Sequence, residues 1–177
     1  AKKYLKEKLG IEILSFVSQV GDIKTDIDFN LVTEEQIESN IVRCPDPAVA
    51  EEMIKLIEKM RDSGDSIGGV ITGVIKNVPA GLGEPVFDKL NADLGKAMLS
   101  INAVKGFEIG SGFEGTTMRG SQHNDEFYID EHDTIRTKTN RAGGTLGGIS
   151  TGEDIYFRVA FKPVSTIKKQ QQTVTKD

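Results

Sequence analysis

GGTLGGISTG (residues 143–152), EDIYFRVAF (153–161) and KPVST (162–166) encode a glycine-rich loop, a strand and a basic turn. Polar and apolar side chains alternate along the middle segment. One face carries Ile155, Phe157, Val159 and Phe161, and the other carries Tyr156, Arg158, Ala160 and Lys162. A period of two with one apolar face is typical of a half-buried strand. The stretch therefore predicts a sheet strand, covered on one side, that leads into a basic turn.

Positive charge collects at the end of this stretch. From Arg158 to Lys169 there are four basic residues and no acidic one, although the chain has a net charge of −5. This local change of sign suits an anionic ligand such as a phosphate. The alternative is a solvated basic edge strand, because charge runs are usually exposed surface.

The composition is that of an ordinary soluble globular protein, with 177 residues, 37% of them hydrophobic, and no tryptophan. This length predicts a single domain over residues 1–177, with a loose polar tail at 167–177. The mild acidity argues against general nucleic-acid binding. Cys44 is the one cysteine, which excludes an intrachain disulfide and fits a reducing cytoplasm. No apolar run reaches the length of a membrane span, and no signal peptide is recognised.

The clearest helix is predicted from Pro47 to Ser63. Asp46 is a good N-cap, Pro47 suits the first helical position, and Gly64 ends the helix. Its apolar stripe consists of Ala50, Met53, Ile54, Ile57 and Met60.

Other elements follow from the same patterns. Helices are predicted at 1–9, ending at Gly10, and at 84–100, with Phe87, Leu90, Leu94, Ala97 and Met98 facing inward. Strands are predicted at 11–20 (extended to 27), 70–78, 101–109 and 126–130, with a loop or short helix at 33–39 and a loop at 79–83. The strand at 70–78 has β-branched residues on both faces and is expected to be central. This helix–strand alternation by itself suggests a parallel α/β sheet.

Glycine-rich segments occupy the middle of the chain, where 17 of the 19 glycines lie between Gly64 and Gly152. The segment from Gly110 to Gly115 matches GxGxxG, but no helical stripe follows it, so a dinucleotide site is rejected. Residues 64–69 are interpreted as a helix stop and turn. The loop at 140–152 has too many glycines for one tight turn, which favours close approach of a ligand or another chain.

His123 and His132 are the two histidines, and both lie in polar, loop-like sequence. Beyond the neighbouring acidic residues, neither has ligand spacing to another metal-binding residue type, so both are interpreted as surface histidines. No metal site and no serine–histidine–acid arrangement is predicted.

A series of segments resembles the chorismate synthase family. The matching segments are Cys44–Asp46, Gly64–Gly69, Pro79–Leu90, Ser100–Gly110, Asn124–Glu126, Thr139–Gly144, Leu146–Ser150 and Lys162–Thr166. They cover nearly the whole chain in order. The resemblance implies an α+β fold, a layered β-α-β sandwich with antiparallel sheets, assembled as a homotetramer. It also implies a lyase that converts 5-enolpyruvylshikimate 3-phosphate to chorismate with loss of phosphate, using reduced FMN, in a family also associated with NADP.

By matching motifs, the resemblance implies eight flavin-binding residues: Asn102, Ala103, Gly147, Lys162, Pro163, Val164, Ser165 and Thr166. The Asn102 amide can both donate to and accept from a flavin ring edge. Lys162, Ser165 and Thr166 offer a point charge and two hydroxyls to the ribityl phosphate. Val164 stands where a threonine is common, which removes one donor, and residues 122–137 form a longer segment than in compact members.

The family's catalytic motifs are not found in this sequence. The Gly-Glu-Ser-His-Gly motif, the arginine-rich region with a second histidine, and the Arg-His-Asp-Pro motif have no counterpart here, so no catalytic residue is assigned. His123 and His132 do not match the family's catalytic histidines. The expectation is an internal piece of a cytoplasmic enzyme that is nearly inactive alone. The alternative is a non-catalytic assembly module that pairs with copies of itself or with other segments of its parent.

Overall fold

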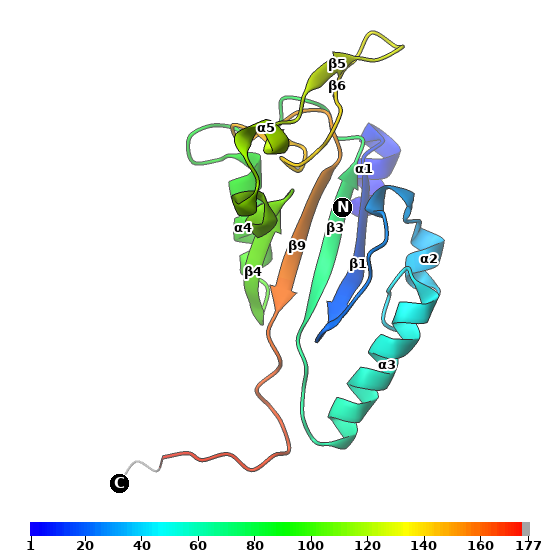
Figure 1. Cartoon of the computed structure of the whole chain (residues 1–177), viewed down its shortest axis with the longest axis vertical. Helices are drawn as coiled ribbons and strands as arrows, with labels where there is room; N and C mark the ends of the chain where they lie inside the picture. Colours follow the sequence, from blue (N-terminus) through cyan, green and yellow to red (C-terminus); the bar gives the residue numbers. More distant parts are fainter. Residues whose placement is uncertain (175–177) are drawn as a thin grey trace.

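The computed structural model describes residues 1–174, and its central feature is a five-stranded sheet with the order β2-β1-β3-β9-β4 (Figure 1). The strands of this sheet are β1 (Glu12–Val20), β2 (Ile23–Lys24), β3 (Gly69–Lys76), β4 (Val104–Ile109) and β9 (Ile155–Phe161). Two short hairpins lie outside it. They pair β5 (Phe127–Ile129) with β6 (Ile135–Thr137), and β7 (Thr145–Leu146) with β8 (Ile149–Ser150).

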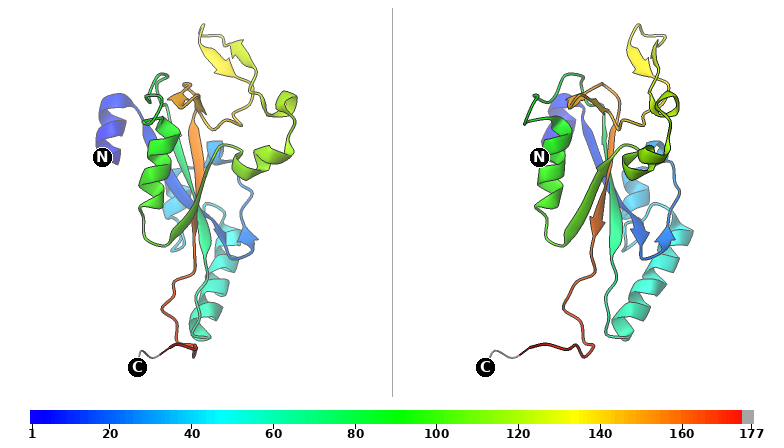
Figure 2. Two further views of the ribbon diagram at one scale, coloured as in Figure 1. Left: turned by 90° about the vertical axis from the view of Figure 1, so that its left-hand side faces the viewer. Right: turned by 60° about the vertical axis from the view of Figure 1, so that its left-hand side comes forward.

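The helices are α1 (Lys2–Leu9), α2 (Glu34–Glu38), α3 (Pro47–Asp62), α4 (Leu90–Leu99) and α5 (Gly120–His123), with 3-10 turns η1 (Phe29–Leu31) and η2 (Gly112–Thr117). Figure 2 shows α4 on one side of the sheet and the segment of η2 and α5 on the other. The β5–β6 hairpin projects from one end of the molecule.

All strand pairs are antiparallel, which confirms the mixed helix and antiparallel sheet implied by the resemblance. The parallel sheet suggested by helix–strand alternation is wrong. The connection between β1 and β3 starts and finishes at the same end of the sheet, so β3 runs antiparallel to β1. The connection that contains α4 crosses back to the other end, so β4 runs parallel to β3, but β9 lies between them and is antiparallel to both. The helix–strand alternation does not reveal that a strand from later in the chain is inserted between two parallel ones, so the pattern alone could not predict the sheet. Residues 1–174 contribute one antiparallel sheet with helices packed on it.

One face of the sheet packs against α4. Leu90, Leu94 and Met98 of this helix pack against a cluster that includes Phe157. The rings of Phe107 and Phe157 lie 5.7 Å apart, across the β4–β9 pair. Ile155, Phe157 and Val159 are buried, as the alternation in the sequence predicts, so β9 anchors this part of the core.

The other face carries a second cluster. Leu14, Phe16 and Val74 are buried there against Val32 and Ile37 from the segment that connects β1 to α3. In the same region the rings of Phe29 and Tyr156 stack with centroids 4.5 Å apart. The cluster covers one end of this face, and Thr72 and Arg158 lie beyond it, near Glu114 of η2.

Helix α3 begins where the sequence predicts. The Asp46 carboxylate accepts hydrogen bonds from the backbone N–H groups of Ala48 at 3.0 Å and Val49 at 3.2 Å. Ala50 and Met53 are buried with Val20 and Cys44. The predicted stripe is only partly buried, because Ile57 lies near the far end of the helix with 38% of its surface exposed.

Three predicted elements differ clearly from the structure in their boundaries. The extension of the first strand to 27 is wrong, because the chain turns at Gly21 and returns as β2 beside β1. The helix at 84–100 begins only at Leu90, so Phe87 is 89% exposed, and Ala97 is also exposed. The strand at 101–109 begins at Val104. The strand at 126–130 is confirmed, but its partner β6 was not predicted.

The start of α4 has a physical reason. Leu90 donates its backbone N–H to the carbonyl oxygen of Gly148 at 2.8 Å, which fixes the first residue of the helix against the β7–β8 turn. Before it, Glu84 and Asp88 exchange backbone hydrogen bonds in an isolated bridge. Pro85, which cannot donate a backbone hydrogen bond, lies inside that bridge.

The polar segment after Thr166 makes specific contacts at its start. The backbone N–H of Lys168 donates to the carbonyl oxygen of Gly64 at 2.8 Å, and Lys169 forms an ion pair with Asp65 at 2.6 Å. The predicted loose tail at 167–177 stays a prediction, and its residues 175–177 lie outside the described part of the chain.

Candidate functional site

Two segments of the predicted flavin site meet in the structure. Asn102 and Ala103 form the turn between α4 and β4, and Lys162 follows directly after β9. The backbone N–H of Lys162 donates to the carbonyl oxygen of Ala103 at 3.0 Å. Ala103 has a φ of 69°, a left-handed conformation that turns the chain sharply at this contact. The turn and the end of β9 thus form one surface, which we call the 103–162 junction.

The turn at 64–69 holds the segment after Lys162 in place. The Ser66 hydroxyl donates to the carbonyl oxygen of Val164 at 2.6 Å. A Cβ on Gly68 would lie 2.5 Å from the carbonyl oxygen of Phe161 and 3.1 Å from Pro163 Cδ, so the two backbones are in close contact. The structure agrees with the interpretation of 64–69 as a helix stop and turn, and adds that this turn supports the 162–166 segment.

Four side chains of the predicted flavin-binding segments are exposed and available. Within residues 1–174, no hydrogen bond or ion pair to the chain is made by the side chains of Asn102, Lys162, Ser165 and Thr166. An ammonium group and two hydroxyls can donate to a phosphate, and a carboxamide can pair with a flavin ring edge. The donor set therefore fits FMN, which needs both kinds of contact.

Gly147 lies elsewhere. It occupies the turn of the β7–β8 hairpin with a φ of 60°, and a Cβ at this position would meet open space. Its neighbour Gly148 binds the start of α4, whereas Asn102 follows the end of α4. Ten helical residues separate the two places, about 15 Å at 1.5 Å per residue. The structure thus brings Asn102, Ala103 and Lys162 together at one end of α4 and places Gly147 at the other. The segment after Pro163 runs from the junction towards the end of α3, where Thr166 lies beside Met60 and Gly64.

The basic run is less positive than its sequence indicates. Arg158 forms an ion pair with Glu108 on the neighbouring strand, with Nε and Oε1 2.6 Å apart. Lys169 pairs with Asp65, which lowers the pKa of that carboxyl below its ordinary value. Lys162 remains as the cation available to a ligand at the 103–162 junction.

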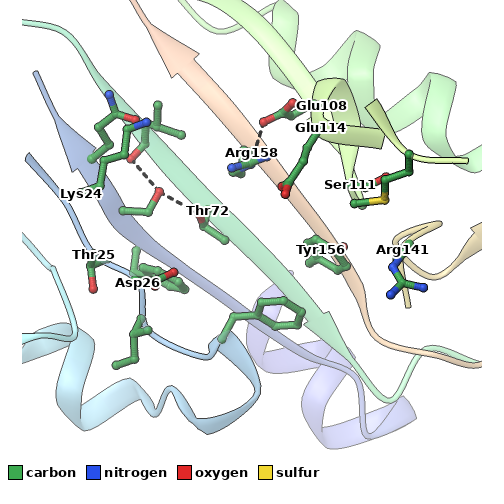
Figure 3. A pocket seen from close by; sticks show the side chains of 18 residues that line it. Lys24, Thr25, Asp26, Thr72, Glu108, Ser111, Glu114, Arg141, Tyr156 and Arg158 are labelled. Carbon is green, nitrogen blue, oxygen red and sulfur yellow. Dashed lines mark hydrogen bonds and ion pairs between the residues drawn. The ribbon is translucent and has the colours of Figure 1, made fainter. Parts of the chain in front are cut away.

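A polar groove of about 540 Å³ lies on the sheet face opposite α4 (Figure 3). This groove was not predicted from the sequence. The lining residues labelled in Figure 3 come from the β2 segment, β3, β9, β4 and the segment after it, and the loop at 141. Its charged side chains are Lys24, Asp26, Glu108, Glu114, Arg141 and Arg158. The alternation in β9 was the available signal, because it puts Tyr156 and Arg158 on the face opposite the core.

The floor of the groove contains paired and unpaired hydroxyls. Thr72, which is buried, donates to the Ser18 hydroxyl at 2.8 Å. The Thr25 hydroxyl oxygen is buried without a hydrogen-bond partner in the described chain. Positive and negative side chains are mixed along the walls, so the groove shows no preference for one charge sign.

The histidines differ from each other in their surroundings. His132 lies exposed beside the β5–β6 hairpin, as predicted for a surface residue. His123 is half-buried, and its Nε2 lies 2.8 Å from the Ser111 hydroxyl. Ser111 and His123 are 12 positions apart in the sequence, on either side of η2, and no local pattern indicates their contact. Over residues 1–174 no group of three His, Cys, Asp or Glu side chains could hold a metal ion.

Asp125 organises the glycine-rich loop. Its carboxylate accepts hydrogen bonds from the Thr139 hydroxyl at 2.6 Å and from the backbone N–H groups of Arg141 and Ala142, each at 2.9 Å. Burial acts to raise the pKa of Asp125, but these donors outweigh it and hold the pKa below its ordinary value. The loop that leads to Gly147 is therefore fixed by a charged acceptor.

Comparisons with known proteins agree with this geometry. The family model described as chorismate synthase matches residues 1–177. A chorismate synthase of Synechococcus elongatus is 61% identical over 175 residues, which are 99% of this chain and 48% of that protein. A protein of Solanum lycopersicum named chorismate synthase 2, chloroplastic, is 61% identical over 180 residues, 100% of this chain and 42% of that protein.

A solved structure is also similar. It is titled as the crystal structure of a chorismate synthase, and it superposes with a TM-score of 0.82 at 36% sequence identity. The match covers 92% of this chain and 52% of that one. The chain thus spans about half the length of the curated relatives it matches. No helix within residues 1–174 is long and apolar enough to cross a membrane.

Proposed function

The chain belongs to the chorismate synthase family, and on that premise we propose that it forms the flavin-holding part of a chorismate synthase. The reaction is the conversion of 5-enolpyruvylshikimate 3-phosphate to chorismate with loss of phosphate. The reaction requires reduced FMN as a bound cofactor, although substrate and product do not differ in oxidation state. The observation that carries the proposal is the 103–162 junction, where the hydrogen bond from Lys162 to Ala103 joins the two predicted flavin-binding segments.

Each residue at the junction has a role that its chemistry allows. Lys162 places one positive charge beside the ribityl phosphate, and the hydroxyls of Ser165 and Thr166 donate to its oxygens. Asn102 pairs with the edge of the flavin ring through its carboxamide. Pro163 and Val164 shape the turn, and Ala103 offers its backbone. The carbonyl oxygen of Val164 is already held by Ser66, so this turn is formed before a ligand arrives.

Gly147 requires a different explanation, because it lies at the other end of α4. We assign its flavin contact to another copy of the chain, in the homotetramer that the family resemblance implies. Its turn is open, so the backbone could approach a ligand held by a neighbour. In this proposal the 177 residues act as one domain, and self-association completes the flavin site.

Acid–base catalysis is assigned to other parts of the parent enzyme. Neither His123 nor His132 stands in the family's catalytic motifs, and His132 is exposed on a hairpin far from the junction. A positioned general acid or base contributes about 10²–10⁴-fold to a rate. We therefore expect the 177-residue chain alone to bind flavin but to release almost no phosphate.

The test is an anaerobic titration of the chain and reduced FMN with 5-enolpyruvylshikimate 3-phosphate, following flavin absorbance and free phosphate together. A flavin shift without phosphate release supports the division of roles. Phosphate release at about 1 s⁻¹ or faster, an ordinary enzymatic rate, contradicts it. Lys162→Gln should weaken the flavin shift, and Lys8→Gln on α1 is the matched control because it removes one exposed positive charge beyond the opposite end of the sheet.

The second candidate function is an assembly module without a ligand site. The edges of the sheet favour it, because β4 has a sheet partner on one side only within residues 1–174. In that case the titration gives no flavin shift, and the mass measured by light scattering rises with concentration.

As to compartment, we propose the cytoplasm, since Cys44 is a free, buried thiol.

A further inference from the structure

The polar groove on the sheet face opposite α4 has no role in the proposed flavin chemistry. Of the residues that line it within the described chain, none is among the eight predicted flavin-binding residues. Its volume of about 540 Å³ is in the range of small-molecule sites, about 300–1,000 Å³. The groove is therefore a candidate site for a second small molecule.

Unpaired charges of both signs line the groove. Lys24 and Asp26 lie on the wall formed by the β2 segment, and Glu114 and Arg141 lie on the opposite wall (Figure 3). None of these four side chains forms an ion pair with a charged group of residues 1–174. The other two charged side chains of the groove pair with each other. Positive and negative charges thus balance, which disfavours an occupant that is only anionic or only cationic.

Tyr156 lies in the floor of the groove, close to two of these charges. Its hydroxyl makes no hydrogen bond within residues 1–174. Burial raises the pKa of Tyr156, so the hydroxyl stays protonated and can donate. The charges of Glu114 and Arg141 both reach the phenol, the first raising and the second lowering the same pKa. One acceptor and two donors therefore lie near each other in this part of the groove.

Arg141 is held in place by the protein. One terminal nitrogen of its guanidinium donates to the carbonyl oxygen of Gln122 and to the Thr139 hydroxyl, the latter at 3.3 Å. The Nε and Nη2 groups make no hydrogen bond within residues 1–174. A guanidinium that is already oriented loses little freedom when it binds a carboxylate through two parallel hydrogen bonds.

Apolar side chains lie beside this polar part of the groove. The ring of Phe29 stacks on Tyr156, and Ile27 packs against the same cluster. Met118, which is half-buried, lines the groove as well. A thioether side chain adapts to occupants of different shape. The groove can thus cover an apolar group attached to a charged head.

We propose that the groove binds an α-amino acid with an apolar side chain. Its ammonium group lies on Glu114, its carboxylate lies on Arg141 and the Tyr156 hydroxyl, and its side chain lies against Phe29 and Met118. An α-amino acid carries opposite charges on a single carbon, which matches an acceptor and two donors near one phenol. The proposal does not depend on the flavin contacts, because the two sites share no predicted residue.

The test is a titration of the ¹⁵N-labelled 177-residue chain with L-leucine and with L-phenylalanine, followed by NMR. The tighter ligand is then compared with its two analogues, one without the ammonium group and one without the carboxylate. We expect the backbone amide signals of Glu114, Gly115 and Tyr156 to shift, with a dissociation constant of about 1 mM or lower. Each analogue should bind at least about tenfold more weakly, because it loses one charge-assisted contact.

Two variants separate the halves of the charged head. Glu114→Gln should weaken binding of the amino acid at least about tenfold and leave the analogue without ammonium no weaker. Tyr156→Phe keeps the stacked ring and should weaken only ligands that carry a carboxylate, about fivefold. Glu7→Gln on α1 is the control, because it removes an exposed negative charge outside the groove and should change no dissociation constant.

Three results would overturn the proposal. The first is an absence of shifts with both amino acids. The second is equal binding of the amino acid and its two analogues, which would mean that apolar contact alone holds them. The third is a Glu114→Gln variant that binds the amino acid like the unmodified chain. Glu114→Gln should leave the FMN titration unchanged, so failure of this proposal and failure of the flavin proposal are distinguishable.

Discussion

Lys162 donates its backbone N–H to the carbonyl oxygen of Ala103 at 3.0 Å, and this bond joins segments that are 59 residues apart in the sequence. It continues the β4–β9 pairing by one contact beyond the last strand residue. The basic turn therefore starts from a fixed backbone position beside the end of α4. This explains how two separate sequence motifs can present their donors to one ligand.

The first prediction concerns the charge on Lys162. Replacing it by glutamine should lower the affinity for FMN about tenfold, the size expected when one charge-assisted contact to a phosphate is lost at an exposed site. Riboflavin, which lacks the phosphate, should bind the variant and the unmodified chain equally. Fluorescence titration of both flavins checks this, with Lys8→Gln as control. An equal loss for riboflavin would show that Lys162 shapes the turn rather than binding the phosphate.

The second prediction compares two glycines. Gly68→Ala should lower the free energy of unfolding by about 1–3 kcal/mol, because its Cβ would lie 2.5 Å from the carbonyl oxygen of Phe161 and one backbone must move. The shift would carry Pro163 with it and weaken flavin binding. Gly147→Ala meets open space, so only its φ of 60° should count, at about 1–2 kcal/mol.

Urea unfolding of both variants, together with FMN titration, checks this pair. Gly120→Ala serves as control, because its Cβ meets nothing within 4 Å and its backbone has no positive φ. If Gly68→Ala unfolds like Gly120→Ala, then the close packing of the 64–69 turn on the 162–166 segment is not important for stability.

Local signals were sufficient for some of the fold. Asp46 and Pro47 mark the start of α3 through groups within three residues of each other, and the structure shows the predicted cap. The alternation in β9 reports burial directly, because successive side chains of a strand face opposite sides. The central position of β3, between β1 and β9, followed from its β-branched residues on both faces.

Contacts between residues far apart in the sequence account for the predictions that the structure contradicts. Phe87 fits a helical stripe, yet α4 starts only where Leu90 meets Gly148, 58 residues away. Strand direction and the Ser111–His123 contact depend on how distant segments return. The predicted flavin residues came from motifs of a known family, and no pattern in the chain indicated that Ala103 and Lys162 meet while Gly147 lies apart.

The third prediction concerns Asp125. Asp125→Asn should lower the free energy of unfolding by about 1–3 kcal/mol, because the carboxylate accepts from Thr139, Arg141 and Ala142, and an amide would point one donor at another donor. Asp133→Asn is the control. It removes the same charge from an exposed turn residue with a φ of 58°, a conformation that asparagine tolerates.

The same variant gives a pH dependence. The folded pKa of Asp125 lies below its unfolded value of about 3.9, so its stabilisation is complete above that pH and is lost as the pH falls through the folded pKa. The difference in unfolding free energy between the unmodified chain and Asp125→Asn should therefore be constant at neutral pH and shrink below about pH 4. A difference that does not change down to pH 2 would contradict the role given to the carboxylate.

The last prediction concerns Cys44, which is completely buried against Ala50 and Met53. Burial raises the pKa of its thiol, so the reactive thiolate is rare at neutral pH as well as inaccessible. The native chain should react with a thiol reagent only when it opens, at a rate that rises with urea along the unfolding curve. Cys44→Ser places a hydroxyl among apolar side chains and should cost about 1–3 kcal/mol of unfolding free energy, more than Cys44→Ala. Fast labelling without urea would mean that the contact between α3 and the end of β1 opens while the rest of the sheet stays folded.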